Sequence, residues 1–191
     1  MNLTRLLSRF PSMIPVLVLL AGCARLSFQV QVEPASLPEL DQAAVMERLA
    51  GALRFPTVSY SETAPTESAA FLALNAYLAE AFPSVHNHLQ REIVNDYSLL
   101  YTWTGSDPAL EPLLLLGHTD VVPADSVAWR TPPFAGVIHD NTVIGRGTLD
   151  DKSCVLGILE AVEYLLQQNF QPERTVLLAF GHDEEIGGSR G

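Results

Sequence analysis

Cysteines and positively charged side chains are scarce in this sequence of 191 residues. The two cysteines, Cys23 and Cys154, exclude a disulfide-rich framework, and Cys154 is expected to be a small buried residue of a helix. Lys and Arg number 11 against 22 Asp and Glu, which gives a formal net charge of -11. This charge argues against nucleic acid as a partner and is typical of an acidic protein that attracts cations.

The chain has no internal repeat and no low-complexity tract. Hydrophobic residues make up 48% of it, which is enough to form a core and excludes a globally disordered protein. Its length indicates one domain or part of a larger one.

The apolar run over residues 13–21 is too short to span a bilayer as a mature helix. It follows a basic start and ends in Leu20-Ala21-Gly22-Cys23, which resembles a bacterial lipobox. We therefore predict a lipoprotein-type signal peptide over residues 1–22 and a linker over residues 23–38. Lipid on Cys23 would anchor the exported protein to a bacterial membrane, facing the periplasm or the exterior. An ordinary signal peptide of a secreted protein, or a signal anchor, is the alternative.

Residues 39–191 have the pattern of an α/β domain. Helical spacing is present over residues 38–53, 65–82 and 151–168. Strand patterns cover residues 89–94, 97–104, 113–116, 137–138, 142–144 and 175–180. The leucine run over residues 113–116 is expected to be a buried central strand. Helices that alternate with strands predict a three-layer domain, with a mixed, largely parallel sheet flanked by helices.

Three polar clusters lie at the ends of these elements: His118-x-Asp120, Asp150-Asp151 and Asp183-Glu184-Glu185. Ligands of open α/β sheets bind outside the carboxyl ends of strands, so the clusters can converge. Imidazole and carboxylate groups suit Zn²⁺, with Mn²⁺ or Co²⁺ as alternatives. One of the two glutamates could bind metal while the other acts as a base.

Each cluster taken alone has a simpler interpretation. A His-x-Asp sequence is usually a surface pair, and Asp-Asp before a helix usually caps it. Asp-Glu-Glu is usually a solvated turn. Their joint placement at element ends favours a metal site instead.

Four sequence motifs, in a fixed order along the chain, also favour a metal site. They are His118-Thr119-Asp120-Val121-Val122-Pro123, Trp129 with Pro133-Phe134-x-Gly136, Gly145-Arg146-Gly147-Thr148-x-Asp150-Asp151-Lys152, and Gly181-His182-Asp183-Glu184-Glu185-x-Gly187-Gly188. Together they resemble the M20 family of metallopeptidases, and most closely its branch of carboxypeptidase S and N-acyl-amino-acid hydrolases.

The resemblance implies a two-zinc hydrolase that cleaves a small peptide or an N-acyl amino acid. It assigns roles as follows: His118 to one metal, Asp150 to both metals, Glu185 to the other metal, Glu184 as general base and Asp120 as the group that orients His118. The family often has an unusual peptide bond after the bridging position, and Asp151 need not touch metal.

The family also needs a further acidic ligand, a histidine and a second domain that serves as lid or dimer interface. These are not found in the 191 residues. Residues 39–191 are therefore expected to be the N-terminal portion of the catalytic domain, with little activity alone, and a homodimer would form through the absent domain. The alternative function is a non-catalytic surface lipoprotein that binds a ligand or partner.

The end of the chain, Gly187-Gly188-Ser189-Arg190-Gly191, matches the Gly-x-Ser-x-Gly pattern of serine hydrolases. That motif requires a following helix and a downstream acid and histidine. The match is therefore interpreted as coincidence. His86, His88 and His139 are interpreted as surface residues.

Overall fold

The computed structural model describes residues 39–63, 66 and 68–191. The predicted signal peptide over residues 1–22, Cys23 and the linker over residues 23–38 lie outside the described residues. The helices and strands described below belong to one compact unit, Leu40–Gly191. Among the described helices, none combines the length and the apolar character needed to cross a membrane.

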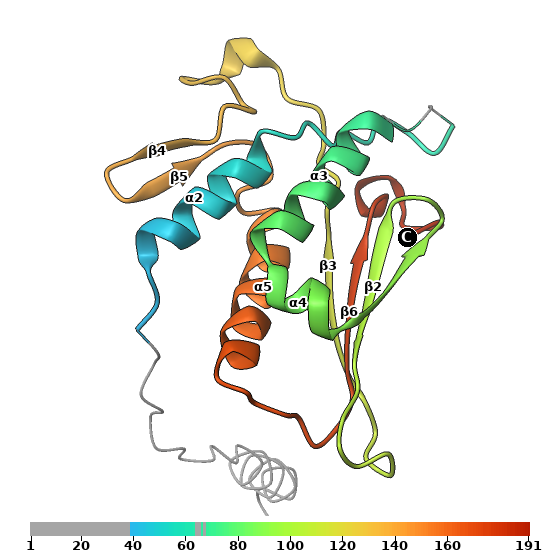
Figure 1. The fold of residues 1–191 in the computed structure, drawn as a ribbon. Helices are drawn as coiled ribbons and strands as arrows, with labels where there is room; N and C mark the ends of the chain where they lie inside the picture. The colour runs from blue at the N-terminus through green and yellow to red at the C-terminus, as the bar shows by residue number, and fades with distance from the viewer. Residues whose placement is uncertain (1–38, 64–65, 67) are drawn as a thin grey trace, which may run out of the picture. The chain divides into compact units, whose positions relative to one another are not determined.

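A four-stranded sheet with the strand order β1-β2-β6-β3 forms the centre of this unit (Figure 1). The strands are β1 Gln90–Val94, β2 Ser98–Trp103, β3 Leu113–His118 and β6 Val176–Gly181. The β1–β2 and β2–β6 pairs are antiparallel, and the β3–β6 pair is parallel. The predicted α/β class and mixed sheet are confirmed, although one pair in three is parallel rather than most of them.

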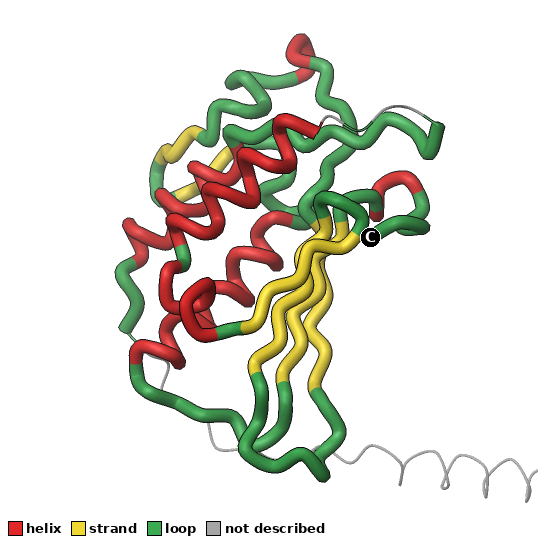
Figure 2. Tube along the Cα trace, turned by 45° about the vertical axis from the view of Figure 1, so that its right-hand side comes forward, coloured by secondary structure: helices red, strands yellow, loops and turns green. Residues whose placement is uncertain are grey.

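Four helices lie on one face of this sheet (Figure 2). They are α2 Gln42–Leu53, α3 Ser68–Ala81, α4 Pro83–His88 and α5 Lys152–Gln167. The core lies between the two layers, where alternate residues of β2 and β6 pack against apolar helix positions. Its strand residues are Leu99, Tyr101, Trp103, Leu178 and Phe180. The predicted third layer is not found among the described residues.

The leucine run shows why one expectation was wrong. Within the described sheet, β3 is an edge strand rather than a central one. Leu114 and Leu116 are 50% and 64% exposed on the face without helices. Cys154, predicted to be buried, is exposed as well, with its Sγ 3.7 Å from the carbonyl oxygen of Leu116. An apolar run indicates a preference for burial, but it does not show which neighbours are present.

Neighbouring strand patterns form two hairpins. β1 and β2 are joined at Asn95 and Asp96, which have φ values of 45° and 70°. β4 Val137–His139 and β5 Thr142–Ile144 form a separate ribbon. Its turn also has positive φ at both central residues. Asn and Asp adopt this left-handed conformation more readily than most residues, so the turn sequences select the hairpins.

The segment after β3 is held by the chain that follows α2. Val58 and Val121 form an isolated parallel bridge. The N–H of Ser59 donates to Val121 O at 3.1 Å, and the N–H of Val121 donates to Thr57 O at 2.9 Å. The hydroxyl of Thr57 donates to Thr119 O at 2.6 Å. These bonds fix the backbone on which the first candidate ligand lies.

Candidate metal centre

Parallel pairing of β3 with β6 brings the first and third polar clusters together. His118, the last residue of β3, lies opposite Gly181, the last residue of β6. Both strands therefore end at the same edge of the sheet, and the residues that follow them meet there. After β6 the chain forms a short 3-10 helix, η4, over Glu184–Ile186.

Asp120 joins these two segments. It is fully buried, and its Oδ1 and Oδ2 accept hydrogen bonds from the backbone N–H groups of Glu184 and Glu185, each at 3.1 Å. Nδ1 of His118 lies 3.2 Å from Oδ1 of Asp120 and 3.2 Å from its backbone oxygen. A proton on Nδ1 would leave Nε2 available to a metal, and this is the orienting role predicted for Asp120, which stays a prediction.

The second cluster arrives on the turn before α5. Gly147 in this turn has φ +86°, and a Cβ there would lie 2.8 Å from Cγ1 of Val121, so the turn needs glycine. The Asp150–Asp151 peptide bond is cis, the kind of unusual bond that the resemblance implies. Asp151 occupies the N-cap position of α5 but makes no side-chain capping bond. Its Oδ2 accepts instead from the backbone N–H of His118 at 3.2 Å.

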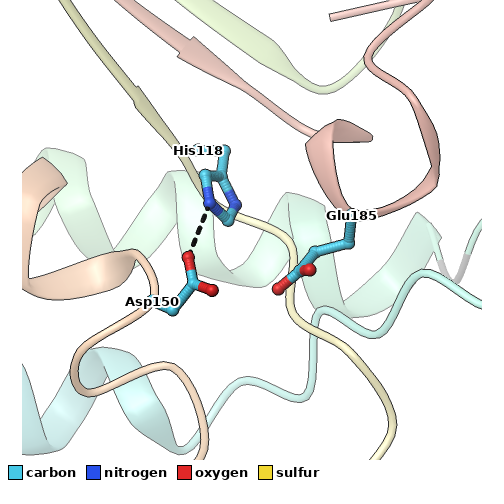
Figure 3. Close-up of side chains that lie close together, drawn as sticks. All are labelled: His118, Asp150 and Glu185. Atoms are coloured by element: carbon cyan, nitrogen blue, oxygen red, sulfur yellow. Dashed lines mark hydrogen bonds and ion pairs between the residues drawn. The ribbon is translucent and has the colours of Figure 1, made fainter.

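Three of the five residues with predicted roles offer their ligand atoms to one point (Figure 3). One ligand atom each of His118, Asp150 and Glu185 lies within 4.8 Å of the other two. Nε2 of His118 is 3.0 Å from Oδ1 of Asp150 and 3.7 Å from Oε2 of Glu184. The side chain of Asp150 is 73% exposed, so the group opens to solvent on its acidic side.

The charges of this group are unbalanced. Burial alone would lower the pKa of His118, but Asp120, Asp151 and Glu184 raise it to about 9. Burial, followed by the charge of Asp150, raises the pKa of Glu185. Burial also opposes ionisation of Asp120, yet the hydrogen bonds it accepts lower its pKa. A cation between these carboxylates would relieve their repulsion.

One residue of the third motif was assigned no role from the sequence. Lys152, at the start of α5, is 1% exposed, and burial lowers its pKa to about 7. It is the only lysine in the 191 residues, because the other ten cationic side chains are arginines. That count was the available signal, since a lone lysine in an arginine-using chain suggests a position that arginine does not fit.

Comparison with known proteins finds relatives in one family. The model of Peptidase family M20/M25/M40 matches residues 114–191. "Probable carboxypeptidase S-like 2" of Dictyostelium discoideum is 45% identical over 159 residues, which are 82% of this chain and 31% of the relative. The chain belongs to peptidase family M20. "N-fatty-acyl-amino acid synthase/hydrolase PM20D1" of Mus musculus is 43% identical over 160 residues, covering 83% of this M20 chain and 32% of the relative.

Solved structures agree on the fold. The crystal structure of human carnosine dipeptidase 1 matches with a TM-score of 0.63 at 21% identity. The match covers 78% of the present chain and 34% of the carnosine dipeptidase chain. At this identity the match shows likeness of fold alone. The M20 chain spans about a third of the length of the curated relatives it matches.

The other histidines lie elsewhere in the M20 chain. His139 and His88 are exposed, as expected. His86 was wrongly expected to be a surface residue: it is half-buried, and its Nε2 lies 2.9 Å from the hydroxyl of Tyr101. His182 is buried, with Nδ1 2.6 Å from Oγ of Ser98. None of these four belongs to the ligand group found among the described residues.

Proposed function

We propose that this protein is a metal-dependent hydrolase that cleaves an amide bond, as an exopeptidase or as an N-acyl-amino-acid amidohydrolase. The observation that carries the proposal is the convergence of His118, Asp150 and Glu185 within 4.8 Å. Membership of family M20 supports it. The names of the relatives, which include a carboxypeptidase and an N-fatty-acyl-amino acid hydrolase, suggest the two substrate classes.

The donor set fits a divalent cation. One imidazole and two carboxylates suit Zn²⁺, with Mn²⁺ and Co²⁺ as alternatives. The acidic surroundings that raise the pKa of His118 to about 9 also favour a cation. We propose two zinc ions, with Asp150 shared between them, His118 on one and Glu185 on the other, as the resemblance to the family implies.

A bound divalent ion supplies Lewis-acid chemistry and lowers the pKa of water from about 15.7 to about 7. Glu184 is the base in this proposal. Its side chain is exposed, with Oε2 3.7 Å from Nε2 of His118, so it lies beside the ligands and can reach a substrate. Glu184 would take the proton and pass it to the leaving amine. Asp120 would keep Glu184 and Glu185 in place through their backbone N–H groups.

Replacing Glu184 by Gln in the full-length parent enzyme tests this function, because residues 39–191 alone are expected to have little activity. Loss of a general base should lower kcat about 10²- to 10⁴-fold, while the zinc content stays unchanged because Glu184 is not a ligand. Glu173→Gln, at an exposed position before β6, is the matched control and should keep full activity. Turnover of dipeptides against N-acyl amino acids identifies the substrate class. Undiminished turnover by Glu184→Gln would rule out this base.

Zinc analysis of the purified protein separates catalysis from the alternative function. Stoichiometric zinc is expected. A protein that takes up no zinc at a micromolar supply would favour the alternative, a non-catalytic surface lipoprotein that binds a ligand or partner.

We further propose that the protein is exported and lipid-anchored through Cys23, on the strength of the lipobox-like sequence alone. Cells fed a clickable fatty acid should label the wild-type protein in the membrane fraction. Cys23→Ala should abolish the label and leave the protein uncleaved. Release of an unlabelled wild-type protein into the soluble exported fraction would favour secretion instead.

A further inference from the structure

The only lysine of the chain is buried beside the candidate metal centre. Lys152 is 1% exposed, although lysine is among the residues least often buried completely. Burial of an ammonium group costs free energy unless polar groups replace its hydration. The hydrogen-bond partners of the Lys152 ammonium group therefore indicate its structural role.

The ammonium group of Lys152 binds the end of α2. Its Nζ donates to the carbonyl oxygens of Phe55 at 2.7 Å and Ala52 at 3.1 Å. Ala52 lies in the last turn of α2, and Phe55 follows the helix by two residues. The last carbonyls of a helix lack partners within it and carry the negative end of its dipole, so they attract a cation. No described ion pair involves Lys152, so these carbonyls are its described partners.

This contact matters to the site because Lys152 follows Asp150 by two residues in the chain. Asp150 is largely exposed, and Leu149 before it is 89% exposed, so neither residue is fixed by packing. The N–H of Lys152 closes the turn by donating to Gly147 O at 3.0 Å. The side chain of Lys152 then anchors the closed turn to the interior.

We propose that Lys152 is a positioning residue, which holds the carboxylate of Asp150 toward His118 by fastening the turn over residues 145–151 to the end of α2. The proposal rests on the proposed metal centre, because Asp150 is a ligand there. Lys152 does not touch the metal or the substrate in this role. Its effect is expected in metal affinity more than in the chemical step.

A second cation provides a matched control. Arg48 in α2 donates through Nη2 to Oε2 of Glu160 in α5 at 2.7 Å and makes a second bond through Nε. Arg48 and Lys152 thus both connect α2 with α5, but Arg48 is not part of the metal-binding turn. Loss of either tie should destabilise the fold. Only loss of Lys152 should disturb Asp150.

The experiment compares Lys152→Met and Arg48→Met with the wild type. Methionine is similar in length to lysine but has no charge and no donor. Zn²⁺ affinity is measured by competition with a chromophoric chelator, and the ligand geometry is followed by the visible spectrum of the Co²⁺ form. Lys152→Met should lose about 10- to 100-fold in Zn²⁺ affinity and change the Co²⁺ spectrum, as supporting residues of metal ligands do. Arg48→Met should bind Zn²⁺ within about threefold of the wild type, near the scatter between independent sites.

The outcomes separate this proposal from the proposed function. A wild-type protein that binds neither Zn²⁺ nor Co²⁺ would overturn the metal centre itself. If the wild type binds and Lys152→Met binds equally well, only the role of Lys152 is overturned. An equal loss of affinity in both variants would reduce Lys152 to a general tie between the helices.

A measurement on the wild type keeps the proposal testable if Lys152→Met fails to fold. Because Lys152 is the only lysine, an amine-reactive reagent can modify only it and the chain's α-amino group, which peptide mass spectrometry distinguishes. Coupling is reciprocal, so if Lys152 strengthens metal binding, bound metal must suppress the opening that exposes Lys152 by the same factor. Zn²⁺ should therefore slow modification of Lys152 about 10- to 100-fold, the range expected for a supporting residue. An unchanged rate would refute the coupling.

Discussion

Asp120 offers the sharpest test of how the site is assembled. Its carboxylate accepts from the backbone N–H groups of Glu184 and Glu185 and lies 3.2 Å from Nδ1 of His118. Asp120→Asn keeps the shape but provides one oxygen where two are needed. In either orientation its NH₂ group faces one of the two backbone N–H groups, which then has no acceptor.

The magnitude follows from these contacts. An unsatisfied buried donor costs about 1–3 kcal/mol, so the metal-free variant should be destabilised by about 2 kcal/mol. For a domain of this size that lowers Tm by about 4–8 °C. If η4 shifts to relieve the clash, Glu185 leaves its ligand position. Zn²⁺ affinity should then fall about 10- to 100-fold, or about 1.4–2.7 kcal/mol.

Thermal unfolding and chelator competition measure the two effects separately. Asp125→Asn is the matched control, because Asp125 also accepts from a backbone N–H, that of Val127 at 3.0 Å, but at an exposed position. It should change neither quantity by more than a small amount. Zinc affinity of Asp120→Asn within twofold of the wild type would refute the argument that Asp120 holds Glu185 in place.

Two further predictions concern the turn and the histidine. Gly147→Ala should cost about 1–3 kcal/mol, seen as a lower Tm, because its φ of +86° and the 2.8 Å approach to Val121 disfavour a Cβ; Gly157→Ala, where a Cβ meets nothing within 4 Å, should instead stabilise α5. In metal-free protein the pKa of His118 is raised to about 9, so the protonated imidazole stabilises the fold. This stabilisation is fully present below pH 6.5 and is lost as the pH rises through 9. Urea unfolding in the presence of a chelator should show the free energy of unfolding fall by about 1–3 kcal/mol over that pH interval. The same fall in His118→Gln would show that His118 is not its cause.

Local patterns were sufficient for much of the fold. The helix over residues 151–168 is observed as Lys152–Gln167, because its apolar stripe is periodic and long. The turn at Asn95 and Asp96 also follows from local chemistry, since both residues tolerate positive φ. The meeting of the first and third polar clusters was predictable because parallel neighbouring strands end at one edge.

Other features depend on neighbours that no local pattern specifies. The leucines of β3 read as buried, yet the strand lies at the edge of the described sheet. Cys154 occupies an apolar-looking helix position but is exposed, because exposure depends on which surface covers that side of the helix.

The sequence by itself determined which residues are candidate metal ligands and near which element ends they lie. Residue type and spacing indicated the three polar clusters, and the resemblance to the family singled out His118, Asp150 and Glu185 within them. Only the tertiary structure decided how these residues are held. The bonds from Asp120 to the N–H groups of η4, and from Lys152 to the end of α2, join segments about 60 and 100 residues apart. Such bonds depend on how distant elements pack, and that packing is a property of the folded chain as a whole.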